Sequence, residues 1–249
     1  MYKEYETNLL QIDEYHKESN SRLRFWYEHI RNSNDLEGDI FEFGVYKGSS
    51  LIAAALILKE IKSDKKVYGF DSFKGFPSYS KFDDLENFYN YKNVYFSENF
   101  IEEYEKYIQL KKYITSKKRF DQTSIPSSGS FNQTSRELVQ KKIDYFDLDN
   151  IILVDGDFKE TVPNFFKNNE VKINSANIDC DLYDGYKITL PYIYEYLSVG
   201  GFVHLDEYYS FNYPGAKIAC DEFFKMNKIK PIKNKSREGE FERWYFTKK

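Results

Sequence analysis

The sequence has few of the residues that make thiolate or imidazole metal sites. Its 249 residues include two cysteines, Cys180 and Cys220, and three histidines. The two cysteines stand far apart in the chain and form no zinc-ligand spacing with the histidines. We therefore expect no zinc site, and we expect both cysteines to be free, mostly buried thiols.

The sequence also lacks an excess of positive charge and any long apolar run. Its 36 Lys and Arg and 40 Asp and Glu are mixed along the chain and leave a net charge of -4, without the basic stripe that nucleic-acid binding needs. The start has no signal-peptide pattern, and no apolar run approaches the roughly 20 residues that span a bilayer. We expect a cytoplasmic protein with neither nucleic acid nor membrane as a partner.

The length of 249 residues suits one α/β domain with additions. Residues 1–34 read as helix and form an N-terminal extension over 1–36. Within it Leu23, Trp26, Tyr27 and Ile30 recur at helical spacing. This stripe indicates core packing more than a binding surface.

The clearest local pattern follows this extension. Residues 38–44, GDIFEFG, read as a buried strand. Residues 49–64 read as a helix whose start Ser49 or Ser50 could cap, and residues 65–73 read as a second strand that carries Asp71 at its end. Strand, glycine turn, helix and strand within so short a stretch predict one βαβ unit with a right-handed crossover.

The pattern loosens after this unit and becomes regular again near residue 134. We expect an insertion over about 78–130 that forms a lid or an oligomer contact. Beyond it we expect helices at 134–146, 157–168, 188–198 and 215–227 and strands at 150–156, 173–181 and 200–209. Residues 229–233 and 243–249 could close the sheet as an antiparallel pair around the turn at 236–241.

The glycine turn, EFGVYKGSS, makes a backbone cradle of the kind found at nucleotide sites. A dinucleotide fingerprint needs G-x-G-x-x-G, whereas here the third glycine is missing and Glu42 precedes the first. An acid at this place favours a ligand that carries an ammonium or sulfonium group over a pyrophosphate. Asp71 suits a ribose in either kind of site. The alternative is a surface acid and a tight turn that bind nothing.

Acids also follow the two late strands: Asp179 and Asp181 after one, Asp206 and Glu207 after the other. Because ligands bind at the carboxyl ends of strands in an open α/β sheet, these acids could converge beside the glycine turn. Oxygen ligands suit Mg²⁺ or Ca²⁺, and a divalent ion could activate a diol for O-methylation. The alternative is that these acids are helix caps or solvated strand ends. For His204, on the same strand as Asp206, we favour a packed core position over a catalytic base.

Six segments resemble, in order, the macrocin O-methyltransferase family, which includes mycinamicin and novobiocin sugar methyltransferases. They lie at residues 38–50, 67–77, 129–139, 154–163, 177–208 and 215–224. The resemblance implies a class I methyltransferase fold, Rossmann-like, with seven strands, the last antiparallel, and helices on both faces. It also implies transfer of methyl from S-adenosylmethionine to a sugar hydroxyl with Mg²⁺.

The resemblance implies roles for individual residues as well. Asp179 would be the general base, and the metal ligands would be Asp179, Asp206 and Glu207. The cofactor would contact Glu42, Gly44, Tyr46, Gly48, Ser49, Ser50, Asp71, Ser72, Asp157, Phe158 and Asp179, with Asp71 at its ribose and Asp157 and Phe158 near its adenine. The sequence departs from the family at Asn177, where His is usual, and at Glu207, where Asp is usual.

The sequence thus predicts a metal-dependent S-adenosylmethionine O-methyltransferase that acts on a sugar or a sugar-containing small molecule, and a homo-oligomer is compatible with it. Alternatives are a methyltransferase for a nitrogen, phosphate or phosphoramidate acceptor, a Rossmann oxidoreductase, and a non-catalytic binding module.

Overall fold

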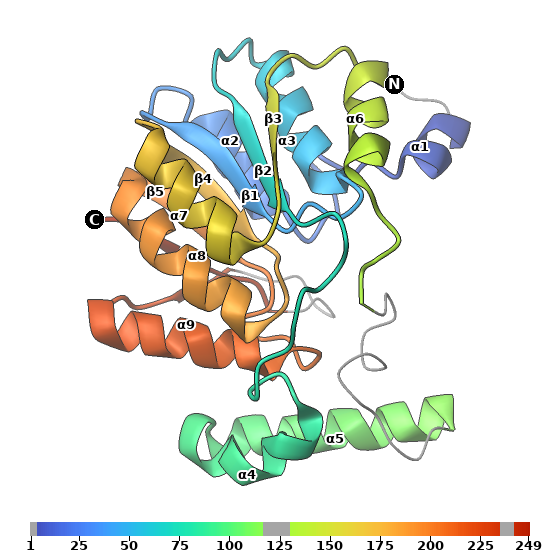
Figure 1. The fold of residues 1–249 in the computed structure, drawn as a ribbon, viewed down its shortest axis with the longest axis vertical. Helices are drawn as coiled ribbons and strands as arrows, with labels where there is room; N and C mark the ends of the chain where they lie inside the picture. The colour runs from blue at the N-terminus through green and yellow to red at the C-terminus, as the bar shows by residue number, and fades with distance from the viewer. Residues whose placement is uncertain (1–3, 117–129, 235–241) are drawn as a thin grey trace.

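The described residues form one seven-stranded sheet of order β3-β2-β1-β4-β5-β7-β6 (Figure 1). The computed structural model describes residues 4–116, 130–234 and 242–249. The strands are β1 (Asp39–Phe43), β2 (Val67–Asp71), β3 (Ile151–Asp155), β4 (Ile173–Ile178), β5 (Leu197–Leu205), β6 (Ile232–Lys233) and β7 (Trp244–Thr247). Neighbours among β1 to β5 pair in parallel, and β7 is antiparallel to both β5 and β6. The predicted seven-stranded methyltransferase sheet with its last strand antiparallel is confirmed.

Helices cover both faces of this sheet, so its central strands are buried on both sides (Figure 1). One face packs on α7 (Phe158–Asn168), α8 (Tyr183–Tyr196) and α9 (Pro214–Asn227). The other packs on α2 (Arg24–Asn32), α3 (Ser49–Glu60) and α6 (Arg136–Tyr145). Within the described ranges, no helix has the length and apolar character needed to cross a membrane.

The predicted cap of α3 is wrong. Gly48 occupies the N-cap position with φ of 80°, and no side chain caps the helix there. Ser49 and Ser50 instead form its first turn. The left-handed backbone at Gly48 turns the chain sharply from the glycine turn into α3, which a serine at the cap would do only under strain.

The N-terminal extension is two helices and not one. A non-helical segment, residues 11–23, separates α1 (Glu4–Leu10) from α2. Local hydrogen bonds compete with helix there, because the Ser21 hydroxyl donates to Asp13 at 2.6 Å and the Tyr27 hydroxyl donates to the same carboxylate at 2.7 Å. The stripe of Leu23, Trp26, Tyr27 and Ile30 is fully buried against the sheet, which confirms it as core.

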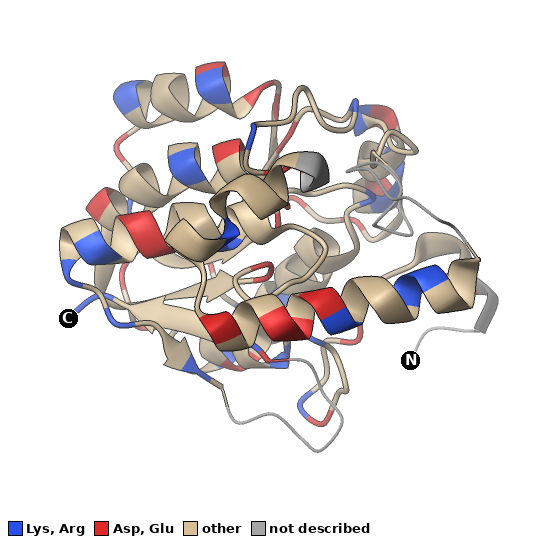
Figure 2. Ribbon diagram, turned by 90° about the horizontal axis from the view of Figure 1, so that it is seen from below, with Lys and Arg blue, Asp and Glu red and all other residues tan. Residues whose placement is uncertain are grey.

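The loosened stretch contains two helices, α4 (Leu85–Tyr95) and α5 (Glu98–Thr115), which lie beyond the carboxyl ends of the central strands (Figure 1). They share a small core of their own, in which Phe88, Phe100 and Tyr104 pack with Ile218 of α9. Along α5 the acidic residues precede the basic ones (Figure 2). The predicted insertion at about 78–130 lies partly, and the predicted turn at 236–241 wholly, outside the described residues.

Candidate active site

The candidate site lies where the order of the strands reverses, between β1 and β4. There the chain runs through β1, β2 and β3 in one direction and through β4 and β5 in the other. Connections leave such a switch point on opposite faces of the sheet, which opens a crevice at the carboxyl ends of the strands. A cavity of about 860 Å³ occupies this place and reaches from the glycine turn to α5. It lies in the upper part of the range of about 300–1,000 Å³ for small-molecule sites.

The glycine turn lies against the end of β4, and this contact explains Gly44. Gly44 has φ of 96°, and a Cβ added to it would lie 1.9 Å from the backbone oxygen of Asp179. Neither the left-handed backbone nor the close approach allows a side chain. The absence of a side chain at this position brings the turn after β1 against the acids that follow β4.

Asp71 holds the same turn from the end of β2. Its Oδ2 accepts hydrogen bonds from the backbone N–H groups of Val45 and Tyr46, both at 2.8 Å, and its Oδ1 accepts one from Phe73 at 2.7 Å. Asp71 also lines the cavity, where the sequence places a ribose. In this structure, two of these hydrogen bonds fix the glycine turn, and the third, from Phe73, is local to the end of β2.

Glu42 lies beneath the turn and does not line the cavity. It is 0% exposed, and its Oε1 accepts a hydrogen bond from the Asn177 side-chain amide at 2.8 Å. Burial raises its pKa to about 8, although hydrogen bonds from Ser50 and Asn177 oppose the rise. Glu42 therefore keeps its proton near neutral pH, and in this structure it does not line the cavity; a contact between Glu42 and the cofactor stays a prediction.

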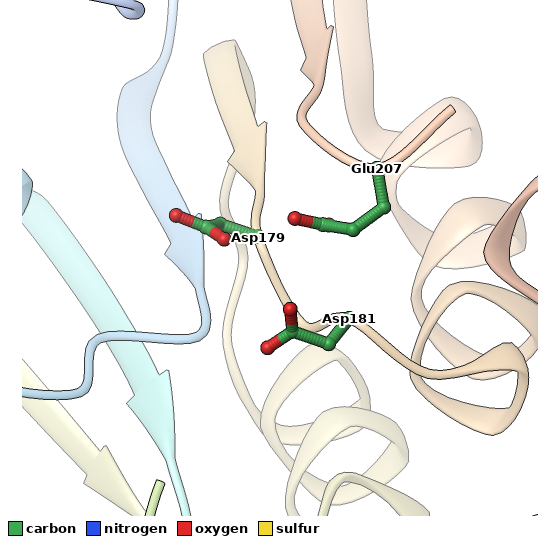
Figure 3. Close-up of side chains that lie close together, drawn as sticks. All are labelled: Asp179, Asp181 and Glu207. Atoms are coloured by element: carbon green, nitrogen blue, oxygen red, sulfur yellow. The ribbon is translucent and has the colours of Figure 1, made fainter. Parts of the chain in front are cut away.

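Three acids meet at the carboxyl ends of β4 and β5. One carboxylate oxygen from each of Asp179, Asp181 and Glu207 lies within 4.8 Å of the others (Figure 3). The Tyr186 hydroxyl donates to Glu207 at 2.7 Å and orients it. Burial, together with the neighbouring carboxylates, raises the pKa of Glu207 well above its usual range. Two of the three metal ligands expected from the sequence, Asp179 and Glu207, lie in this cluster. Its third member is Asp181.

Asp206, the third expected ligand, faces a cation that the sequence analysis missed. The Arg22 guanidinium forms one ion pair with Asp206 through Nη1 and another with Asp179 through Nη2, the latter at 2.5 Å. Burial opposes ionisation of Asp206, but Arg22 outweighs it and holds the pKa of Asp206 well below its usual range. His204, fully buried, approaches the same carboxylate at 3.5 Å, and burial lowers its pKa, as expected for a packed core residue.

The sequence model of the macrocin O-methyltransferase family matches residues 20–112 and 114–241, which is most of the chain. The chain belongs to this family. It is therefore an S-adenosylmethionine-dependent O-methyltransferase. A comparison with curated protein sequences finds no significant match.

Solved structures with this fold include two O-methyltransferases. The calicheamicin methyltransferase CalS11 is 22% identical with a TM-score of 0.65, over 97% of this chain and 89% of that one. The O-methyltransferase NovP is also 22% identical, with a TM-score of 0.61, over 89% of this chain and 78% of that one. At this identity the likeness shows the shared fold.

Part of the lining of the methyltransferase cavity is aromatic. The Tyr107 ring from α5 packs on Phe211 with centroids 5.6 Å apart, and Tyr209, Phe211 and Tyr213 from the loop between β5 and α9 line the same cavity. The Tyr107 hydroxyl donates to Asn212 of that loop at 2.5 Å, so the inserted helix is tied to the loop that follows Glu207. This wall is the product of tertiary contacts between segments about a hundred residues apart.

Six further residues that the sequence assigns to the cofactor line the cavity on the side of β1 and β3, whereas Gly48 is not among the lining residues. The six are Tyr46, Ser49, Ser50, Ser72, Asp157 and Phe158. Asp157 also caps α7, since its Oδ1 accepts from the Lys159 N–H at 2.9 Å. The Phe158 ring meets the edge of Phe43 with centroids 6.1 Å apart. The structure brings these residues to one cavity, and their individual roles stay predictions.

Arg22 escaped sequence analysis because no local signal marks it. It lies in a segment expected to be helical, and its partners Asp179 and Asp206 follow other strands far along the chain. The neighbouring Trp26 was assigned to core packing, and that packing is what carries Arg22 to the acids.

Proposed function

We propose that this methyltransferase transfers the methyl group of S-adenosylmethionine to a hydroxyl of a sugar or sugar-containing small molecule, with Mg²⁺ held by its acids. The observation that carries the proposal is the cluster of Asp179, Asp181 and Glu207 near the glycine turn, which shares one cavity with a wall of aromatic side chains. A sugar ring offers C–H faces to aromatic side chains and hydroxyls to carboxylates, so it matches both walls.

The names of the similar structures agree with this acceptor class. CalS11 is described as a TDP-rhamnose 3'-O-methyltransferase, and this second structure of it has a TM-score of 0.53 to the present chain. The aromatic wall supports carrying the sugar class over. The inserted helix α5, which supplies part of that wall and packs against α4, would select the particular acceptor.

The donor set at the acids fits a hard divalent cation. Carboxylate oxygens are the ligands that Mg²⁺ prefers, and three of them gathered in a buried cluster repel one another without a cation. We propose that Asp179 and Glu207 hold the ion, with Asp206 as the third ligand expected from the family resemblance. When bound, Mg²⁺ would lower the pKa of an acceptor hydroxyl and stabilise negative charge on its oxygen.

The chain's own residues would supply orientation and a proton acceptor. The glycine turn and Asp71 position the methyl donor at the end of β1, and the Tyr186 hydroxyl holds Glu207 in place. As the acceptor oxygen attacks the methyl carbon, the C–S bond breaks, and the hydroxyl proton passes to a carboxylate. We propose Asp179 for that proton, since it lies in the acid cluster and lines the cavity.

Asp181 is a second candidate for the proton acceptor. It lies in the same cluster and lines the same cavity, while the Asp179 carboxylate is engaged by Arg22 at 2.5 Å. Asp179→Asn and Asp181→Asn separate the two. We expect Asp179→Asn to abolish turnover with near-normal affinity for S-adenosylhomocysteine by calorimetry, and Asp181→Asn to retain some activity.

The matched control is Asp155→Asn, which changes an exposed strand-end acid outside the cavity and should leave turnover unchanged. Turnover is measured as methyl transfer to a panel of nucleotide-linked sugars and free glycosides. Full activity of Asp179→Asn would refute its assignment as base. Transfer to amines but to no hydroxyl compound would refute the acceptor class. A cytoplasmic location and a homo-oligomer stay predictions.

A further inference from the structure

Several contacts hold Arg22 in place between two of the acids. Its guanidinium spans Asp179 and Asp206, with one terminal nitrogen against each carboxylate. The segment that carries it, residues 11–23, is fastened on one side by the Asp13 carboxylate, which accepts from Ser21 and Tyr27. On the other side it continues directly into α2, whose Trp26 indole donates to Ser175 of β4 at 3.1 Å. These contacts direct the side chain of Arg22 into the site.

The two acids that Arg22 contacts are two of the three that the proposed metal site would use. The side chains of Asp179 and Asp206 are 19% and 13% exposed, so a cation between them is largely shielded from water. A guanidinium and a divalent ion repel each other at such distances, and each would use the carboxylates of Asp179 and Asp206. The two cations therefore compete for one position.

Arg22 differs from its partners in one respect that makes exchange feasible. Its side chain is 40% exposed, whereas the acids are mostly covered. The guanidinium can leave by rotation of its own side chain toward solvent, without opening the sheet. Asp179 and Asp206 cannot move away in the same manner, because they directly follow β4 and β5.

We propose that Arg22 is a positioning residue that balances the charge of Asp179 and Asp206 in the cation-free enzyme, and that a divalent cation binds both acids only after Arg22 leaves them. Cation binding would thereby release the segment 11–23 at the mouth of the cavity, and loss of the cation would draw it back. The inference rests on the metal dependence in the proposed function. It adds that the enzyme supplies its own competitor for the metal.

Reciprocity provides the test, because whatever weakens the hold of Arg22 on the acids must strengthen the binding of the metal by the same factor. Mn²⁺ serves as the probe, and its free concentration is read by electron paramagnetic resonance during titration of the full-length enzyme. We expect Arg22→Gln to lower the Kd for Mn²⁺ by at least about tenfold. Arg22→Lys keeps the charge but cannot span two carboxylates, so its Kd should lie between the two.

The matched control is Arg24→Gln, which removes the same charge at a position two residues from Arg22. The Arg24 guanidinium stacks on the ring of Phe25, 4.4 Å from its centroid. This variant should leave the Kd for Mn²⁺ within about twofold of wild type. An unchanged or higher Kd for Arg22→Gln would overturn the proposal, as would an equal gain in both glutamine variants.

A second measurement on the unmodified enzyme guards against misfolding of the variant. Hydrogen exchange of a peptide covering residues 11–24, with and without saturating Mg²⁺, should rise with the metal, while exchange in β4 should not. Unchanged exchange at Mg²⁺ saturation would overturn the proposal.

Methyl transfer measured in parallel separates this proposal from the proposed function. Magnesium-dependent methyl transfer, together with an unchanged Kd for Mn²⁺ in Arg22→Gln, would refute the inference about Arg22 but would not contradict the proposed function. No Mn²⁺ binding by wild type or Arg22→Gln would refute both the inference and the metal requirement. Methyl transfer would still be decided by its own assay.

Discussion

Glu42→Gln is predicted to stabilise the protein, and by an amount that depends on pH. Glu42 is fully buried beneath the glycine turn, where burial raises its pKa from 4.5 to about 8. Glutamine has nearly the same shape, keeps an oxygen to accept from Asn177 and has no charge to bury. The substitution therefore removes the cost of ionising Glu42 and disturbs the packing little.

The sign follows from proton binding. Between pH 4.5 and about 8 the folded protein keeps a proton on Glu42 that the unfolded chain has lost. The free energy of unfolding of the wild type therefore falls as pH rises through this range. Glu42→Gln does not show this fall, because it has no carboxyl group to ionise at this position. The full shift is worth about 5 kcal/mol, of which about 3 kcal/mol has accumulated by pH 7. The variant should exceed the wild type by about these amounts and match it near pH 4.5.

Urea unfolding followed by tryptophan fluorescence at about pH 5, 7 and 8.5 measures this difference. Glu195→Gln, an exposed Glu on α8, is the control and should give no difference that grows with pH. The reasoning fails if the advantage of Glu42→Gln is the same at all three pH values, or if it shrinks as pH rises.

Four further substitutions test other parts of the structure. Gly44→Ala places a Cβ 1.9 Å from a backbone oxygen of Asp179, so we expect loss of cofactor binding or of folding, seen by calorimetry and circular dichroism; a normal affinity would contradict it. Asp71→Ala removes the acceptor of two turn N–H groups and should weaken S-adenosylhomocysteine binding by about tenfold or more in calorimetry. Trp26→Ala should cost about 3–5 kcal/mol in urea unfolding, since Trp26 is fully buried; a cost below about 1 kcal/mol would contradict its core role. Phe100→Ala loosens the core of α4 and α5 and should raise the KM for the acceptor while the cofactor Kd stays unchanged.

The sheet could be predicted because its signals are local. A buried strand followed by a glycine turn and an apolar helix identifies a βαβ unit, and the pair at residues 229–233 and 243–249 contains β6 and β7. Periodicity was equally reliable for Trp26 and Ile30, which are buried as expected. The prediction of a serine cap for α3 was wrong, because the left-handed backbone of Gly48 turns the chain before Ser49.

The site could be predicted in part, for the same reason. Acids that follow parallel strands must arrive at one edge of the sheet, so Asp179 and Glu207 meet as the topology requires. One feature required the tertiary structure. Glu42 points beneath the turn toward Asn177, and whether an acid before a glycine faces a ligand or the core depends on the neighbouring strand.

By itself the sequence determined the βαβ unit, the glycine turn, the family and the gathering of acids at the carboxyl edge, because each follows from periodicity or from motifs in one stretch of chain. Only the tertiary structure decided which cation those acids meet and which wall faces them. Arg22 reaches Asp179 and Asp206, and Tyr107 reaches the loop after Glu207, across long separations in the chain. Such contacts depend on how α2 and α5 pack, and packing of distant segments leaves no pattern in either segment alone.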